Sequence, residues 1–492
     1  MSSIQNGINS TLGRTFRSLH VRNYRLYFFA QAVSQSGTWM QSVAQGWLVL
    51  HLTGSALLLS VAVALQFGPV LFVGPIGGLV ADRADKRKLL IATQTTMTVL
   101  AGVLGVLTLT GAVRVWMIFV LAALYGVTNG LDNPARQAFV SEMVGEDDVV
   151  NAVSLNSVIV NASRVVGPAI AGILIVTVGL AACFLANAVS YLFVIAALVA
   201  MRSAELRRAR PLPRKRGQLR AGFAYVWHTP ELRVPLAIMV VVGTLGYNFS
   251  ILLPLMSKVA FHRGGGTYSS LLVAMGVGAF AAGLYAASRM QPSRRLLVVA
   301  TLGLGTITVV GALMPTLAWE IAALVPLGAF SVLFITTTNS LLQLNSKPAM
   351  RGRVMSLWAV VFLGSTPFGS LAIGGLAAAF GPRVAFATGG AATFLAGIGA
   401  YVALRRRRWP VGAAGEVGAV GEVAAVGEAG EAGATGVVGE AGAAADAADA
   451  VPRPQVCLPD DPEPDEAIGD LEAARLLEGR ALAAALPPRP RA

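Results

Sequence analysis

The chain has 492 residues, of which 55% are apolar and 13% are charged. A soluble domain carries about 25% charged residues, so this composition excludes an ordinary soluble enzyme and a disordered regulator. Together with a mean hydropathy of +0.66, it predicts an all-α integral membrane protein that crosses the bilayer many times.

The net charge of +13 could by itself indicate nucleic-acid binding. The basic residues lie mostly in short segments between apolar runs, where membrane topology explains them better. We therefore expect no nucleic-acid partner. The sequence holds no phosphate-binding loop and no zinc-protease or nucleophile motif, and its four histidines lack the spacing of metal ligands. We expect no enzyme activity, no metal and no cofactor.

A helix that spans a bilayer needs roughly 20 mostly apolar residues. Twelve segments meet this requirement, in two sets of six: 24–50, 57–80, 89–110, 115–135, 151–177 and 180–201, then 234–257, 268–288, 295–314, 319–342, 353–378 and 384–404. The predicted parts of the chain are an N-terminal segment (1–23), a first bundle (24–201), a basic linker (202–233), a second bundle (234–404) and a tail (405–492). The tail is rich in Gly, Ala, Glu and Pro, and we expect it to be disordered.

The distribution of basic residues sets the orientation. With the N-terminus in the cytoplasm, the inside segments carry 27 Lys and Arg residues and the outside loops carry 4. Because basic residues accumulate on the cytoplasmic side, both termini are predicted to be cytoplasmic. The first span then acts as the targeting signal, since residues 1–23 lack the apolar core of a cleavable signal peptide.

The two sets of spans are related in sequence. A shift of 202 residues places six residues of the first set on identical residues of the second. The pairs are Ser154 and Ser356, Leu155 and Leu357, Gly167 and Gly369, Gly172 and Gly374, Gly179 and Gly381, and Phe184 and Phe386. Such an internal repeat predicts two pseudo-symmetric six-helix bundles around a central cavity, an arrangement that transports by alternating access.

The loop after the second span, residues 77–88, reads GGLVADRADKRK. It resembles the signature loop of the major facilitator superfamily: a Gly, three residues, Asp-Arg and a basic cluster. The corresponding residues are Gly78, Asp82, Arg83, Lys86 and Arg87. The resemblance implies that Gly78 lets two helices approach, and that Asp82 meets the start of the eleventh span to close the cytoplasmic side. The family usually has Gly where this chain has Asp85.

Asp132 and Arg136 lie four residues apart at the cytoplasmic end of the fourth span. This spacing allows an ion pair, although Pro134 between them makes the helical geometry uncertain. We interpret the pair as a gating latch, with Asp132 also able to reach the basic loop 83–88. The alternative is that Asp132 carries protons.

Arg164 lies within the fifth span, roughly 20 Å from its start at 1.5 Å per residue. A buried charge is costly unless it faces water or a partner, so we expect Arg164 in the central cavity, binding an anionic or carbonyl-rich substrate or biasing a proton site. The alternative is a packed Arg satisfied by Asn156 and Asn161. The sequence Gly167-Pro168 followed by Gly172 resembles the Gly-Pro motif of the superfamily's antiporter branch.

The first span carries a polar stripe at spacings of three and four residues. A polar stripe in a membrane helix faces a wet cavity or another helix, and we favour the cavity. The predicted cavity residues are Gln31, Gln35, Thr38, Trp39, Gln41, Asn161, Arg164, Asn248 and Asn339.

Several further runs resemble one bacterial branch of the superfamily, the transmembrane secretion effectors, over residues 14–404. They include GTWMQ at 37–41, NPARQAF at 133–139 and RVVGP at 164–168. The resemblance implies export of siderophores, drugs or other secondary metabolites, with proton antiport as the expected coupling. The expected location is the bacterial inner membrane, with lipid, a small-molecule substrate and protons as partners and a monomer as the assembly. No predicted span holds an Asp or Glu at its middle, and Glu320 lies at an outer end. An importer of metabolites or a lysophospholipid flippase of the same superfamily is the alternative.

Overall fold

The computed structural model describes residues 17–145, 148–207, 218–289 and 291–405, all within one compact unit. The predicted tail lies outside the described residues except for Arg405, and so do residues 1–16 of the predicted N-terminal segment.

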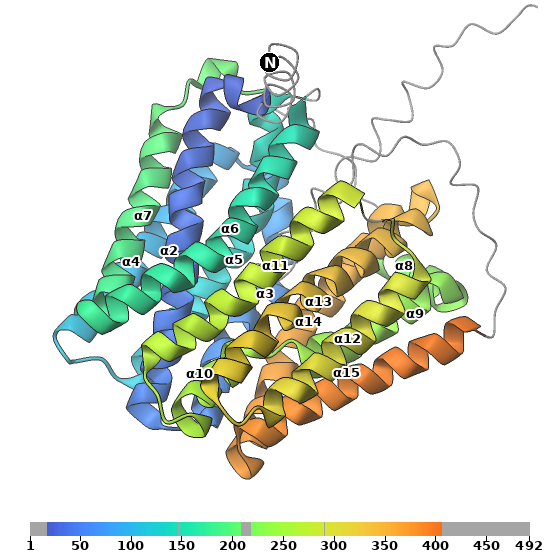
Figure 1. Cartoon of the computed structure of the whole chain (residues 1–492). Coiled ribbons are helices and arrows are strands. Elements are labelled where there is room, and N and C mark those ends of the chain that lie inside the picture. Colours follow the sequence, from blue (N-terminus) through green and yellow to red (C-terminus); the bar gives the residue numbers. More distant parts are fainter. Residues whose placement is uncertain (1–16, 146–147, 208–217, 290, 406–492) are drawn as a thin grey trace, which may run out of the picture. The chain divides into compact units, whose positions relative to one another are not determined.

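Long helices build the described part of the chain (Figure 1). The first set is α2 (Arg22–Thr53), α3 (Ala56–Arg83), α4 (Lys86–Leu109), α5 (Val115–Val144), α6 (Val149–Thr177) and α7 (Leu180–Ala200). The later helices are α8 (Gln218–His228), α9 (Pro230–Val241), α10 (Phe249–Leu255), α11 (Gly265–Arg289), α12 (Arg294–Leu313), α13 (Leu317–Leu344), α14 (Pro348–Phe380) and α15 (Pro382–Arg405). Short turns occupy Arg17–His20 and Ser203–Glu205.

Among the described residues, eleven helical segments are long and apolar enough to cross a bilayer, one fewer than the twelve we predicted. The predicted span outside this set is α2. Its side chains include Gln31, Gln35, Gln41 and Gln45, which lower its hydropathy although α2 is as long as its neighbours. α9 and α10 together form one segment of this set, Pro230–Ala260.

Several helices begin where a short polar side chain caps them. Ser55 accepts a hydrogen bond from the Leu58 amide at 3.3 Å at the start of α3. Asp85 accepts one from the Lys88 amide at 3.2 Å at the start of α4. Asp85 therefore serves as the N-cap of α4, a position that favours Asp.

Two predicted boundaries differ from the structure. α5 continues through Pro134 to Val144, whereas we predicted that the span ends near residue 135. Membrane helices tolerate such a proline because neighbouring helices satisfy the freed backbone groups. The predicted linker contains α8, which packs against α14, and the Tyr225 hydroxyl accepts a hydrogen bond from the Lys347 amide at 3.2 Å.

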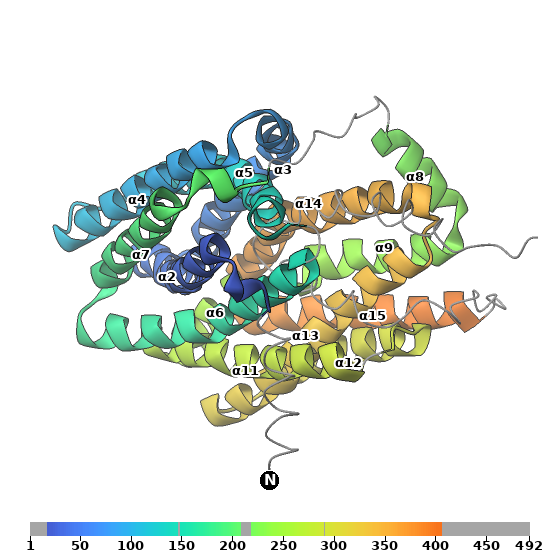
Figure 2. The same cartoon turned by 90° about the horizontal axis from the view of Figure 1, so that it is seen from above.

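The two sets of helices pack in the same pattern (Figure 2). The extensive contacts of α3 with α5 and of α4 with α7 are matched by those of α11 with α13 and of α12 with α15. Between the sets, α6 packs on α11 and α14 packs on α3. Each pair has its counterpart six spans away, so the structure contains the two pseudo-symmetric bundles that the sequence repeat predicts.

Residues that the 202-residue repeat pairs in sequence occupy equivalent places in the two sets of helices. Gly179 and Gly381 both take positive φ values, 106° and 87°, in the turns before α7 and α15. A residue with a side chain is strained in this region, so glycine is favoured at both turns. Phe184 and Phe386 follow these turns and are both fully buried.

Hydrogen bonds identify two sides of the helical unit. We call one of them the signature side. On this side, Ser18 donates to Asn151, and Asn23 donates to the Arg202 carbonyl at 3.1 Å. On the far side, Lys258 of the second set donates to the carbonyl of Leu50 in α2 at 2.6 Å. The two sets therefore contact each other at the far side.

Candidate functional site

Arg164 and Trp39 form a cation–π pair between α6 and α2. The Arg164 guanidinium lies 5.5 Å from the centre of the Trp39 ring. The two helices approach closely at Gly167, where a Cβ atom would clash with the backbone of Ser36 and with Trp39. Both partners are half-buried, so the charge is held beside the ring without being sealed inside the bundle.

The seventh predicted span is broken at its middle. α9 ends at Val241, a π-helical turn covers Val242–Gly246, and α10 begins at Phe249. Tyr247 and Asn248 leave helical geometry between them, with Tyr247 at φ −97° and ψ 43°. Interrupted helices and π-turns of this kind occur often at the binding sites of transporters.

The break directs Tyr247 into a group of aromatic rings. Its ring centre lies 5.6 Å from that of Phe249 and 6.4 Å from those of Phe334 and Phe362. Trp358 stacks on Phe362 at 5.7 Å. The indole nitrogen of Trp358 is buried and has no acceptor among the described residues, which leaves one hydrogen-bond donor for a ligand.

Tyr247 also bonds within the second set, where its hydroxyl donates to the Ser331 carbonyl of α13 at 2.6 Å. Arg164 lies at the contact between the two sets, because a Cβ atom on Gly276 of α11 would lie 3.1 Å from the Arg164 carbonyl. The site thus combines a cation and a Trp ring from the first set with aromatic rings from the second. The aromatic residues Trp358 and Phe362 were missed by sequence reasoning, although their spacing of four residues places them on one face of a helix.

The polar stripe of α2 mostly contacts neighbouring helices of its own set. Gln41 accepts a hydrogen bond from Asn187 at 2.7 Å, and the Thr38 hydroxyl lies 3.1 Å from that of Tyr191, both in α7. Gln31 and Gln35 are buried. Of the predicted cavity residues in α2, Trp39 is the one that lies beside Arg164.

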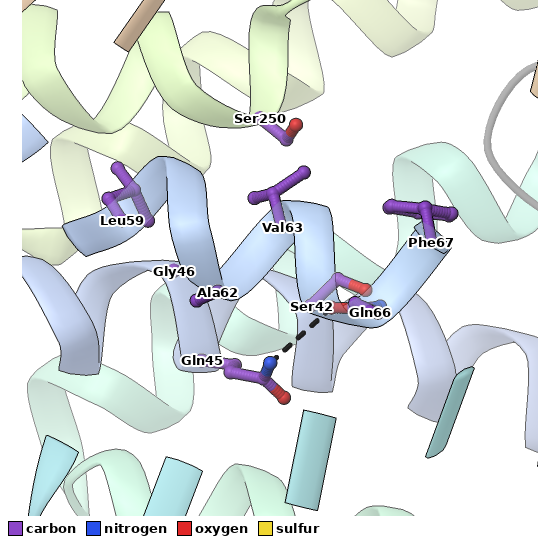
Figure 3. Close-up of a pocket in the computed structure, with 9 residues that line it drawn as sticks. All are labelled: Ser42, Gln45, Gly46, Leu59, Ala62, Val63, Gln66, Phe67 and Ser250. Atoms are coloured by element: carbon purple, nitrogen blue, oxygen red, sulfur yellow. Dashed lines mark hydrogen bonds between the residues drawn. The ribbon is translucent and has the colours of Figure 1, made fainter. Parts of the chain in front are cut away.

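A pocket lies where α2, α3 and α10 meet (Figure 3). Gln45 donates to Gln66 at 3.3 Å on one wall, and Ser250 of the second set lies opposite Val63. The remaining lining residues are Ser42, Gly46, Leu59, Ala62 and Phe67. The pocket joins both sets of helices, and its lining residue Ser250 was not predicted from the sequence.

Three predicted cavity amides bond within their own helices or span. Asn161 donates to the Ser157 carbonyl at 2.9 Å, and Asn248 donates to the Thr244 carbonyl at 2.8 Å. Asn339 accepts from Gln343 at 2.5 Å. Asn161 is half-buried, whereas Asn248 and Asn339 are buried.

The signature loop is anchored within the first set. Lys86 forms a buried ion pair with Glu142 of α5 at 2.7 Å. Arg87 donates to the Leu198 carbonyl of α7 at 2.7 Å. Asp82 is half-buried at the end of α3, which packs along α14, and Arg83 is exposed. Sequence reasoning missed Glu142, since it lies 56 residues from Lys86.

The carboxylate of Asp132 is buried and fully engaged. It accepts hydrogen bonds from Thr93 at 2.6 Å and from Gln94 at 3.0 Å, and Arg136 lies 3.6 Å away. The predicted Asp132–Arg136 pair is therefore present. The predicted contact of Asp132 with the loop 83–88 is replaced by these partners, and Glu142 takes that role.

Glycines of the predicted motifs lie at helix contacts. Helices approach closely at Gly77, the neighbour of Gly78, where a Cβ atom would clash with the Gly130 carbonyl of α5. Gly172, four residues after Pro168, faces Ser269 of α11. The Gly-Pro segment thus packs α6 against both α2 and the second set.

Comparison with known proteins gives one family model along most of the chain. The model of the family described as transmembrane secretion effector matches residues 14–414. The staphyloferrin A transporter of Staphylococcus aureus is 24% identical over 358 residues, which cover 72% of this chain and 90% of that protein. The multidrug efflux pump Tap of Mycolicibacterium fortuitum is 26% identical over 372 residues, which cover 73% and 90%. The enterobactin exporter EntS of Escherichia coli is 25% identical over 384 residues, which cover 76% and 90%.

Solved structures share the arrangement of helices. A bacterial homologue of the human lysosomal transporter Spinster, inward-facing and occupied, has a TM-score of 0.62 at 13% identity and covers 80% of this chain and 99% of its own. A POT family transporter in complex with a thioalcohol-conjugated peptide has a TM-score of 0.64 at 12% identity and covers 78% of this chain and 96% of its own. At these identities the likeness concerns the fold alone.

Proposed function

Because this chain belongs to the transmembrane secretion effector family of major facilitator transporters, we propose that it exports small organic molecules from the cytoplasm by alternating access, in exchange for protons. The relatives that match over 90% of their own length include a multidrug efflux pump and the enterobactin exporter. The charge bias of the loops predicts that the signature side faces the cytoplasm.

The observation that carries this proposal is the composite site between the two sets of helices. Arg164 lies over the Trp39 ring at the contact with α11, and Tyr247 lies among aromatic rings at the break of the seventh span. Aromatic faces bind ring systems, and a guanidinium binds carboxylate or phenolate oxygens in pairs. The site therefore favours organic anions that carry rings over sugars or inorganic ions.

The direct test uses inside-out membrane vesicles, in which export appears as uptake. A proton gradient, acidic inside, is imposed, and fluorescent dyes, antibiotics and siderophores are screened for accumulation. We expect uptake of at least one anionic aromatic compound, and we expect it to collapse when a protonophore removes the gradient.

Two arginine variants make this test specific for the site. Arg164→Gln removes the cation, and we expect the substrate concentration for half-maximal uptake to rise about tenfold, since loss of a cation–π contact and a paired charge costs about 1–2 kcal/mol. Arg233→Gln is the matched control, because Arg233 makes a similar contact with Trp227 but is exposed on α9. Equal kinetics in both variants would remove Arg164 from the site.

A further inference from the structure

Glu320, in the first turn of α13, is a buried carboxyl group without a hydrogen bond. The residue is fully buried, and neither of its carboxylate oxygens has a hydrogen-bond partner among the described residues. It lies on the far side of the helices, where Lys258 and Leu50 join the two sets. No role in the composite site or the signature loop accounts for it.

Helix backbone and aromatic rings surround this carboxyl group. A Cβ atom placed on Gly311 of α12 would lie 3.6 Å from each of the two Glu320 oxygens and 3.4 Å from the Phe386 ring. Phe386 of α15 is itself fully buried. Glu320 is therefore enclosed by α12, α13 and α15 in a site that offers it no donor.

Arg383 of α15 is the charged group that acts on Glu320. Its guanidinium donates to the carbonyls of Ala312, at 3.2 Å, and Met314, at 2.8 Å, at the end of α12. It also lies 5.5 Å from the centre of the Phe261 ring. Arg383 is thus held by backbone oxygens and forms no ion pair with Glu320 in the described part of the chain.

Unlike Glu320, the other buried acidic side chains of the described residues have hydrogen-bond or ion-pair partners. Asp132 accepts two hydrogen bonds and lies beside Arg136, and Glu142 pairs with Lys86. Contacts of this kind offset the cost of burying a carboxylate. An ionised Glu320 would receive no such stabilisation, so in this enclosure the neutral acid is favoured.

We propose that Glu320 is a proton-binding site. It takes up one proton when the far-side ends of α12, α13 and α15 close around it, and it returns the proton to water when these ends part. After release the carboxylate has Arg383 as its nearest counter-charge. Because the closed form holds one more proton, a lower pH on the far side favours closure. The inference deepens the proposed function, because it makes closure of the far side, one step of the transport cycle, depend on pH.

Infrared spectroscopy of the purified full-length chain tests the bound proton without any transport assay. At neutral pH we expect the carbonyl stretch of a protonated carboxylic acid, and we expect Glu320→Gln to remove it. Glu205→Gln is the matched control, since Glu205 forms an exposed ion pair with Arg202, and it should leave the band unchanged. If the glutamine variant folds poorly, Glu320→Asp serves as the second variant. It keeps a carboxyl group and should show the band at a shifted frequency.

A distance measurement tests the coupling to closure. Spin labels at positions 313 and 384, which are exposed at the far-side ends of α12 and α15, report whether these ends are closed around Glu320. In the wild-type background we expect the closed population to increase as the pH falls, whereas Glu320→Gln should be closed at every pH. A band that survives in Glu320→Gln, or the same pH response in both proteins, would overturn the proposal. Neither result depends on export, so a failed uptake screen is a separate outcome.

Discussion

Lys86 and Glu142 form an ion pair in which both side chains are almost fully enclosed. The Nζ–Oε1 distance is 2.7 Å, and the side chains are 9% and 7% exposed. Burying two charges costs several kcal/mol of free energy, and their mutual attraction offsets this cost as long as both are present. Removal of one partner therefore leaves a buried, uncompensated charge at the point where the signature loop meets α5.

Lys86→Met should lower the free energy of unfolding by about 3–5 kcal/mol, because Glu142 stays buried without its partner. The double variant Lys86→Met/Glu142→Leu should recover most of this loss. Denaturant titration of the purified protein measures both. Arg202→Met, which breaks the exposed pair with Glu205, should cost less than about 1 kcal/mol. If Lys86→Met lowers the free energy of unfolding no more than Arg202→Met does, the Lys86–Glu142 pair does not stabilise the protein.

Among the helices, adjacent glycines on α14 separate a helix contact from an open position. A Cβ atom on Gly374 would meet the Ser60 side chain and, at 3.2 Å, the Ala56 carbonyl of α3. A Cβ atom on Gly375 would meet no atom within 4 Å. Because α14 and α3 belong to different sets, the contact at Gly374 forms part of the seam along which the two sets move.

Gly374→Val should overpack this seam at a cost of about 1–3 kcal/mol and reduce transport strongly. Gly375→Val introduces the same side chain one position along the helix and should change neither property. Unfolding and vesicle uptake are measured for both. Adding Ser60→Gly to Gly374→Val should restore part of the loss, since it removes the nearest clashing atoms. If the two valine variants behave alike, the seam is not tightly packed at this point.

Across the whole molecule, the described conformation joins the two sets of helices at the far side. Lys258 bonds to the carbonyl of Leu50, and Gly265 lies beside Trp47. In an alternating-access cycle the opposite conformation must close the signature side instead. We expect Asp82 to hold that second conformation through the start of α14, as an acidic group at the positive end of a helix.

Asp82→Asn should therefore abolish most vesicle uptake while leaving expression and folding intact. Asp85→Asn is the control in the same loop. Asp85 caps α4 through the Lys88 amide, and Asn caps helices as well as Asp does, so its stability and transport should be close to those of the unchanged protein. Normal uptake by Asp82→Asn would contradict the latch.

The sequence predicted the fold because the membrane helices depend on local properties of the chain. Apolar runs of about 20 residues mark the spans one by one. The repeat at a shift of 202 residues predicted related bundles, and Gly179 and Gly381 occupy equivalent turns with positive φ. α2 falls outside the segments that hydropathy identifies, because its polar residues lower its hydropathy, although it is a helix of 32 residues in the first bundle.

The pairing of side chains required the tertiary structure. Pattern alone could not show that Lys86 meets Glu142 or that Gln41 contacts Asn187 in α7, because these partners lie far apart along the chain. The break at Tyr247 was likewise unpredicted, since the segment around it reads as one continuous apolar run.

By itself, the sequence thus determined the class of protein, the helices and the family, which follow from composition, local hydropathy and short motifs. The tertiary structure decided which charges are satisfied. Arg164 and Glu320 are both isolated charges in apolar runs, yet one lies over a Trp ring at a half-buried site and the other is enclosed without a donor. Their chemistry depends on the surrounding dielectric and hydrogen-bond donors, which only helix packing sets.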